Sequence, residues 1–120
     1  MPIFAVTAAL PGRAPEMLAA AGEVRSGPDA GRMDRGDLLA LVEGVDVAVT
    51  MLYDRVDDEL LDAAAPGAFA LHDLPAHAGE EITAEVLYGA RQRIWDQAEN
   101  RRHAQKALLE LLVSAQQDEG

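Results

Sequence analysis

The sequence predicts one α/β domain in which helices cover both faces of a five-stranded parallel sheet. Three observations lead to this prediction. Short apolar runs alternate five times with segments of helical periodicity. Pro and Gly residues separate many of these segments, as turns require. The length of 120 residues is enough for one core but too short for two domains with a cleft between them. Residues 1–120 are therefore predicted to form a single domain.

The first half of the chain supplies three pairs of strand and helix. The run 45–52 is the richest in β-branched residues and is predicted to be the central strand. Asp34 and Asp57 precede apolar helical patterns and are suited to cap the helices that follow them. The predicted strands are 3–8, 23–26 and 45–52, and the predicted helices are 15–21, 34–43 and the segment from Asp58 to Pro66. A turn is expected at 27–29.

The second half supplies two more pairs. Residues 68–71 and 93–95 are predicted strands, and 83–88 is a short predicted helix. Asp96 begins a helix of roughly 20 residues, about 30 Å long, with frayed residues expected from 116 onward. One stripe of this helix is apolar: Ala104, Leu108, Leu111, Leu112 and Ala115. Right-handed crossovers then predict a flavodoxin-like, Rossmann-like three-layer α/β/α sandwich with strand order 2-1-3-4-5.

Composition excludes several classes of function. A net charge of −11 opposes binding to nucleic acid and to anionic membranes, so neither partner is expected. The absence of cysteine excludes disulfides, thiolate metal sites and cysteine nucleophiles. No apolar run approaches the roughly 18 residues of a membrane span, and the first residues do not form a signal peptide. A cytoplasmic location is the expectation.

Residues 2–66 resemble the amino-terminal substrate-domain segment of D-isomer-specific 2-hydroxyacid dehydrogenases such as glyoxylate reductase. The resemblance depends on Leu10-Pro11-Gly12, Ala20-Ala21-Gly22-Glu23-Val24, the 45–52 strand and the segment from Asp54 to Ala64. It implies a flavodoxin-like fold. No Gly-x-Gly-x-x-Gly opens a helix, so no nicotinamide cofactor, and no cofactor of another kind, is predicted.

Residues 68–115 resemble the carboxyl end of ornithine carbamoyltransferases. His72-Asp73-Leu74-Pro75 corresponds to the family's His-Cys-Leu-Pro, so Asp73 stands where the family has a cysteine facing the amino-acid substrate. The segment 76–81 corresponds to Ala-His-Arg-Gly-Glu-Glu, with Ala78 in place of Arg. The resemblance implies that Arg101 matches an arginine that binds carbamoyl phosphate, but the family's Ser-Thr-Arg-Thr and His-Pro motifs are absent from these 120 residues.

Together the two resemblances predict a chimera, engineered or recombined, whose parts meet between 63 and 70. Residues 1–66 would supply three dehydrogenase-like βα units and residues 67–120 two carbamoyltransferase-like units. The predicted function is a scaffold without catalytic activity, hence no enzyme and no catalytic residues. The alternative is a binding module for a small anion or metabolite at the strand carboxyl ends, through Arg13, Arg55 or Arg101, or residual carbamoyltransferase-type or dehydrogenase-type ligand binding.

The residues predicted to form a vestigial ligand site are Arg101, His72, Asp73 and Leu74. His72, Asp73 and His77 could suit zinc if their side chains converged. Inheritance of a substrate-facing loop explains them without an ion, so no metal is predicted. The apolar stripe of the last helix must cover its own sheet or that of a neighbour, which predicts a monomer or a homodimer swapped at a hinge near Asp96.

Overall fold

A computed structural model describes residues 1–28 and 31–119 of the chain, so Asp29 of the predicted turn and the end of the expected frayed tail at Gly120 lie outside it. The order of elements follows the predicted alternation through the first three pairs. The strands are β1 (Ile3–Val6), β2 (Glu23–Ser26) and β3 (Val47–Val49). The helices are α1 (Ala14–Ala21), α2 (Arg35–Val42), α3 (Asp58–Ala63), α4 (Ala84–Leu87) and α5 (Ile94–Glu119).

The three strands form one parallel sheet in the order β2-β1-β3. Phe4 pairs with Val24 on one side and with Val47 on the other, which places β1 in the centre. The chain therefore has an α/β fold with a parallel sheet, and its order agrees with the first three places of the predicted one. The prediction that 45–52 is central is wrong: β3 is an edge strand of three residues, and Val47 is 46% exposed.

The predicted fourth and fifth strands are not strands in the described part of the chain. Ala70 and Gln92 form only an isolated parallel bridge, in which Ala70 N donates to the Arg91 carbonyl and Arg93 N donates to the Ala70 carbonyl. The backbone then turns into α5, because Ile94 N donates to Gln92 Oε1 at 2.6 Å and Gln97 N donates to the Arg93 carbonyl at 3.0 Å. The apolar run 93–95 thus opens the last helix instead of extending the sheet.

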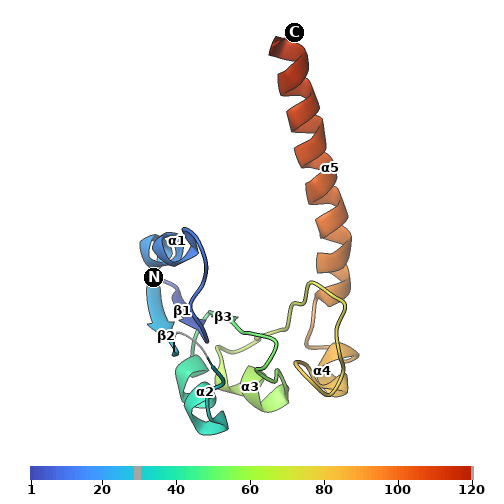
Figure 1. Cartoon of the computed structure of the whole chain (residues 1–120). Helices are drawn as coiled ribbons and strands as arrows, with labels where there is room; N and C mark the ends of the chain where they lie inside the picture. The colour runs from blue at the N-terminus through green and yellow to red at the C-terminus, as the bar shows by residue number, and fades with distance from the viewer. Residues whose placement is uncertain (29–30, 120) are drawn as a thin grey trace.

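Helices lie on both sides of the sheet, with α1 on one side and α2 and α3 on the other (Figure 1). Asp57 caps α3 as predicted, since its Oδ1 accepts a hydrogen bond from Leu60 N at 2.9 Å. Asp34 occupies the cap position of α2 without a side-chain hydrogen bond. The α1 helix contributes no buried residue, so α2 and α3 supply most of the helical cover.

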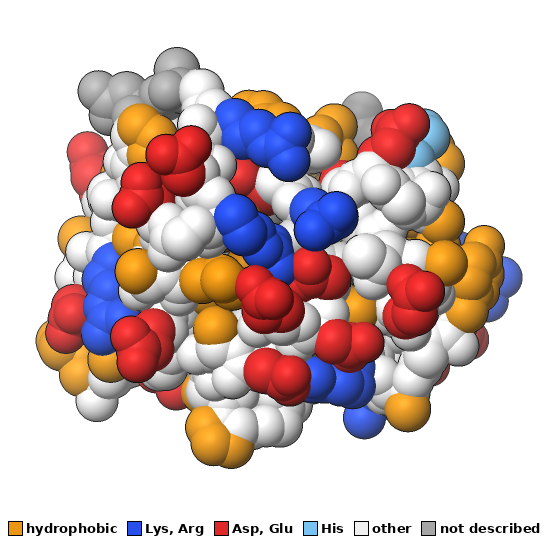
Figure 2. Space-filling view, turned by 90° about the horizontal axis from the view of Figure 1, so that it is seen from below, with side chains coloured by type: hydrophobic (Ala, Val, Ile, Leu, Met, Phe, Trp, Pro, Cys, Tyr) orange, Lys and Arg blue, Asp and Glu red, His pale blue; other side chains and the backbone are white. Residues whose placement is uncertain are grey.

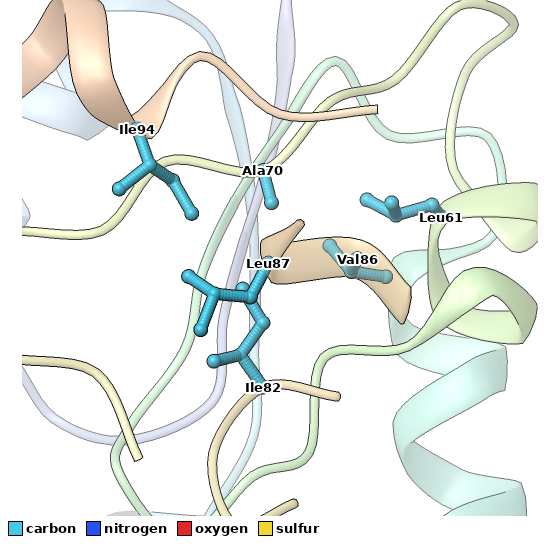
Figure 3. Close-up of a cluster of buried hydrophobic side chains, with 6 residues drawn as sticks. All are labelled: Leu61, Ala70, Ile82, Val86, Leu87 and Ile94. Carbon is cyan, nitrogen blue, oxygen red and sulfur yellow. The ribbon is translucent and has the colours of Figure 1, made fainter. Parts of the chain in front are cut away.

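Two apolar clusters hold the fold together. The first lies between the sheet and the helices α2 and α3, and its buried residues are Ala5, Leu38, Val42, Val45 and Leu60. The second gathers the carboxyl half around α4, and its buried residues, drawn in Figure 3, are Leu61, Ala70, Ile82, Val86, Leu87 and Ile94. Half-buried Val56 packs against both clusters. The segment that links the halves is therefore part of the core.

The last helix projects away from the rest of the molecule (Figure 1). Every residue from Glu99 to Gln117 is exposed, and Leu108, Leu111 and Leu112 each expose more than half of their surface. The apolar stripe therefore does not cover the chain's own sheet. Swapping onto a neighbour's sheet stays a prediction, as does the monomeric state.

Acidic and basic side chains alternate on the face formed by α2, α3 and α4 (Figure 2). Arg35 pairs with Asp57 and Glu59, and Arg91 lies 2.6 Å from Asp62. These pairs interrupt the acidic excess on that face. None of the helices in residues 1–28 and 31–119 combines the length and apolarity that crossing a membrane requires.

Candidate functional site

A pocket of about 600 Å³ lies where β3 ends and the loop after residue 70 begins. Its position fits the expectation that ligands of parallel α/β sheets bind at the strand carboxyl ends. The wall from the end of β3 is Thr50, Met51 and Leu52, and the opposite wall comes from the loop 71–82 and from Gln97 of α5. His72, Asp73, Leu74, His77 and Glu81 all line it. Three of the four predicted site residues therefore share one pocket.

Three hydrogen bonds fix His72 in the wall of the pocket. Its backbone N donates to Gln97 Oε1 at 2.8 Å, which ties the loop to the first turns of α5. Its ring Nδ1 accepts from Leu74 N at 2.8 Å, so in the neutral ring the proton must sit on Nε2. Nε2 then donates to Glu81 Oε1 at 3.0 Å. The side chain of His72 is only 10% exposed and is held by partners at both ring nitrogens.

Glu81 is the buried anion of the site, with 6% of its surface exposed. Its Oε1 accepts from His72 Nε2 and, at 2.8 Å, from the backbone N of His77. Burial alone would raise the pKa of this carboxyl. The hydrogen bonds from the backbone of His77 and of Glu81 itself, from the His72 ring, and the charge of His77 outweigh burial and lower the pKa to about 2. Glu81 is therefore ionised at neutral pH.

The tip of the loop presents Asp73 to solvent. The side chain of Asp73 is 84% exposed and makes no side-chain hydrogen bond within the described residues. The next residue, Leu74, has φ +56°, a left-handed conformation that is uncommon for a branched side chain. Such backbone outliers cluster at ligand-binding loops, where surrounding contacts hold them in place. The strained turn keeps Asp73 at the mouth of the pocket.

Arg101, the fourth predicted residue, does not line the pocket. Its guanidinium reaches the backbone carbonyl of Asp73 at 3.5 Å, a weak contact from the exposed first half of α5. The other two arginines proposed for anion binding are engaged elsewhere: Arg13 lies 3.9 Å from Glu16, and Arg55 lies 3.6 Å from Asp57. The structure does not bring these arginines together in the pocket.

Sequence reasoning missed the groups that hold the opposite wall. Asp54 is 2% exposed, and its Oδ2 accepts from Met51 N at 2.8 Å and from Thr7 Oγ1. These bonds close the turn that places Thr50, Met51 and Leu52 at the pocket. Glu81 and Gln97 were also missed as site residues: Gln97 meets His72 across 25 positions, and no sequence signal marked the carboxylate of Glu81 as buried. Of the three residues considered for zinc, His72 and His77 both approach Glu81. The largely exposed Asp73 carboxylate lies 3.5 Å from His72 Nδ1.

A family model described as "Aspartate/ornithine carbamoyltransferase, Asp/Orn binding domain" matches residues 39–112, which is more than half of the chain. An ornithine carbamoyltransferase of Synechococcus sp. is 61% identical over 61 residues, covering 51% of this chain and 20% of the relative. One from Azoarcus sp. is 59% identical over 58 residues, covering 48% and 19%. The chain spans about a fifth of the length of the curated relatives it matches.

Solved structures agree with these matches. The crystal structure of ornithine carbamoyltransferase from Burkholderia thailandensis aligns with a TM-score of 0.65 at 28% identity, covering 92% of this chain and 47% of that one. The enzyme from Gloeobacter violaceus aligns with a TM-score of 0.61 at 40% identity, covering 81% and 35%. The alignment therefore extends well into the half that precedes residue 66.

These findings correct the prediction of a chimera. The family model begins at residue 39, inside the segment assigned to a dehydrogenase, and crosses the predicted junction at 63–70 without interruption. No match supports the 2-hydroxyacid dehydrogenase resemblance of residues 2–66. The prediction of an engineered or recombined scaffold without catalytic activity, and with it the prediction of no enzyme, is also wrong, because the chain matches a family of enzymes and its relatives are named ornithine carbamoyltransferases. The chain belongs to the aspartate/ornithine carbamoyltransferase family and contains residues of its Asp/Orn-binding domain.

Proposed function

We propose that the chain is the amino-acid-binding part of a carbamoyltransferase and that its pocket binds an amino acid with an amine on its side chain, such as ornithine. The observation that supports this proposal is the pocket built by residues 50–97, inside the segment that matches the family. Its lining carries two carboxylates, Asp73 at the mouth and Glu81 in the wall, the latter beside His72 and His77. An acidic pocket attracts a cationic ammonium group more strongly than a neutral side chain.

In this proposal each predicted residue has a distinct role. Asp73 pairs with the side-chain ammonium, a task that suits a carboxylate better than the thiol at the same place in the family. The His72 ring and Leu74 backbone keep Asp73 in position through the 2.8 Å bond between them. Arg101, beside the Asp73 carbonyl, provides a positive charge for an anionic co-substrate such as carbamoyl phosphate.

A calorimetric comparison tests the role of Asp73. L-Ornithine should bind more tightly than L-norvaline, which has the same carbon chain without the side-chain amine. Replacing Asp73 by Asn should weaken ornithine binding by about 1 kcal/mol, roughly fivefold, and leave norvaline binding unchanged, since the lost ion pair is largely exposed. Asp37→Asn, at an exposed position of α2, is the matched control and should change neither affinity. Equal binding of ornithine and norvaline by the original protein would contradict the proposal.

We further propose that the three-layer, five-stranded arrangement describes the complete domain, with 68–71 next to β3. An apolar pocket of about 440 Å³ lies between β3 and the segment 64–71 and is lined by Val47, Leu61 and Phe69 among others. The isolated bridge between Ala70 and Gln92 is parallel, as expected for two neighbouring strands of such a sheet. A single domain and a cytoplasmic location stay predictions.

A further inference from the structure

We propose that His77, Glu80 and Glu81 form a binding site for a divalent transition-metal ion of the zinc class at the rim of the pocket. The proposal does not depend on the identity of the amino acid that the pocket binds. One ligand atom from each of the three residues lies within 4.8 Å of the other two. Imidazole nitrogen and carboxylate oxygen are both common ligands of Zn²⁺.

The spacing between His77 and Glu81 suits a tetrahedral ion. His77 Nδ1 lies 3.4 Å from Glu81 Oε1. An ion about 2.1 Å from each of two tetrahedral ligands separates them by about 3.4 Å. The widest separation that one such ion can span is about 4.2 Å, so any two ligand atoms of the trio that lie between this value and 4.8 Å come into range by a small rotation of a side chain. Glu80 is exposed and the His77 side chain is 62% exposed, so both are able to make that rotation.

The backbone turn that carries the three residues is already closed. Glu80 N donates to the His77 carbonyl at 3.0 Å, and Gly79 N donates to the Ile82 carbonyl at 2.8 Å. Gly79 has φ +91°, a conformation that other residues rarely adopt. The three donors are therefore brought together by a turn of the backbone, which lowers the entropy lost when an ion binds.

The buried carboxylate has the support that metal ligands usually have. Glu81 Oε1 accepts hydrogen bonds from His72 Nε2 at 3.0 Å and from the His77 backbone at 2.8 Å, which fix the orientation of the carboxylate. Both hydrogen bonds end on Oε1, the oxygen that lies nearest His77 Nδ1, so an ion would displace one of these donors or bind the second oxygen, to which no side chain of the described residues donates. Three protein ligands leave a fourth position for water or for a ligand atom from the adjoining pocket, as in zinc sites that are not closed.

A second His–Glu pair provides an internal comparison. On α5, His103 Nε2 lies 3.4 Å from Glu99 Oε1, the same separation, but both side chains are more than half exposed. The described residues near this pair offer no third carboxylate or imidazole close enough to complete a trio. The His103 pair therefore tests whether proximity of one imidazole and one carboxylate is sufficient.

Titration of the 120-residue chain with Zn²⁺, followed by calorimetry, tests the proposal. We expect one saturable site, weakened at least tenfold by His77→Ala and by Glu80→Gln. His103→Ala and Glu85→Gln, which alter an exposed His and an exposed Glu outside the trio, should change the affinity less than twofold. Circular dichroism establishes that each variant is folded, and because His77 and Glu80 are exposed, their replacement leaves the core intact. Visible absorption of the Co²⁺-loaded protein should show a tetrahedral site that His77→Ala removes.

Two results would overturn the proposal. One is the absence of a saturable one-to-one site in the original chain. The other is Zn²⁺ binding that survives in the His77→Ala, Glu80→Gln double variant or that disappears in His103→Ala. Either result would assign the ion to general attraction by a chain of net charge −11 or to the pair on α5.

Discussion

At the scale of single residues, Glu81 connects the loop 71–78 to the fold. It is buried, ionised and hydrogen-bonded to both His72 and the backbone of His77. Burial of a carboxylate without such donors would cost hydration free energy and destabilise the folded state. The same bonds that make burial of the charge tolerable also orient His72 and so position Asp73. Folding, and the ligand binding that we propose, therefore depend on the protonation of one side chain.

The lowered pKa of Glu81 predicts a specific loss of stability in acid. The pKa falls from 4.5 to about 2 on folding, so between these values the unfolded chain binds more protons than the folded chain. The contribution of Glu81 to the free energy of unfolding is fully present above pH 4.5 and is lost as the pH falls toward 2. Glu81→Gln should reduce this pH dependence, as measured by urea unfolding between pH 2 and 7 in the presence of a chelator.

Replacing the exposed Glu85 by Gln is the control for that measurement. This variant should keep the slope of the original protein, that is, the change in its free energy of unfolding with pH. Part of the slope should survive in Glu81→Gln, because Asp57 also has a lowered pKa. Burial would raise it, but the hydrogen bonds from Leu60 N and Arg35 and the charges of Arg35 and Arg55 outweigh that effect. Identical slopes for the original protein and Glu81→Gln would show that the contacts of Glu81 do not distinguish its two protonation states.

At the scale of elements, the contact between α1 and β1 is tight at Gly22. A β-carbon added there would lie 2.2 Å from the Pro2 carbonyl oxygen and 2.9 Å from a ring carbon of Phe4. The Pro2 carbonyl accepts from Glu23 N at 3.0 Å, at the start of the pairing between β1 and β2. Gly22 is required by this close approach, not by its backbone angles, because its φ of −175° is open to any residue.

Gly22→Ala should therefore lower the free energy of unfolding by about 1–3 kcal/mol, the usual cost of overpacking. Gly36→Ala is the matched control, since a β-carbon on this α2 residue meets no heavy atom within 4 Å. It should raise stability by about 0.5–1 kcal/mol through the better helix propensity of Ala. Urea denaturation of both variants measures the difference. Equal effects at the two positions would mean that the contact with Pro2 relaxes without cost.

The elements also show how far local sequence signals reach. The strands β1 and β2, the cap at Asp57 and the long last helix were predicted from neighbouring residues, because their causes are local. The runs 68–71 and 93–95 were predicted as strands from the same kind of signal. Whether these runs become strands depends on pairing with distant segments. In the structure the second run opens α5, and Ile94 joins the core from the first turn of that helix. Short apolar runs do not distinguish a strand from a buried helix start.

The site likewise combines residues that local sequence signals indicated with residues that they did not indicate. The motif His72-Asp73-Leu74 was recognised in the sequence, and the structure places all three residues at the pocket. The contacts of Gln97 with His72 and of Asp54 with Thr7 join positions 25 and 47 residues apart, so no local pattern indicated them. The predicted chimera failed for a related reason: resemblance in short segments of the first half was weaker information than a match running continuously from 39 to 112.

At the scale of the whole molecule, the body of the protein (residues 1–28 and 31–98) and the projecting part of α5 differ in how they are stabilised. The body has two apolar clusters, whereas α5 is exposed from Glu99 to Gln117. A helix without tertiary contacts lacks the packing that supplies most helical stability in proteins, so this part of α5 depends on helix propensity alone. The two parts should therefore differ in local stability even though they are continuous in sequence.

Removal of the projecting part tests this independence. A chain that ends at Gln105 keeps Gln97 and Arg101 and should unfold with the same free energy as the original chain to within about 0.5 kcal/mol, the usual effect of exposed changes. In the original chain, backbone amides of 106–117 should exchange with solvent much faster than those of the paired strand β1. Protection of 106–117 equal to that of β1, or a stability loss above about 1 kcal/mol on truncation, would show that Leu108, Leu111 and Leu112 are covered in solution. Light scattering would then establish whether the cover comes from a second copy, since a helix-swapped homodimer doubles the mass and its mass falls on dilution.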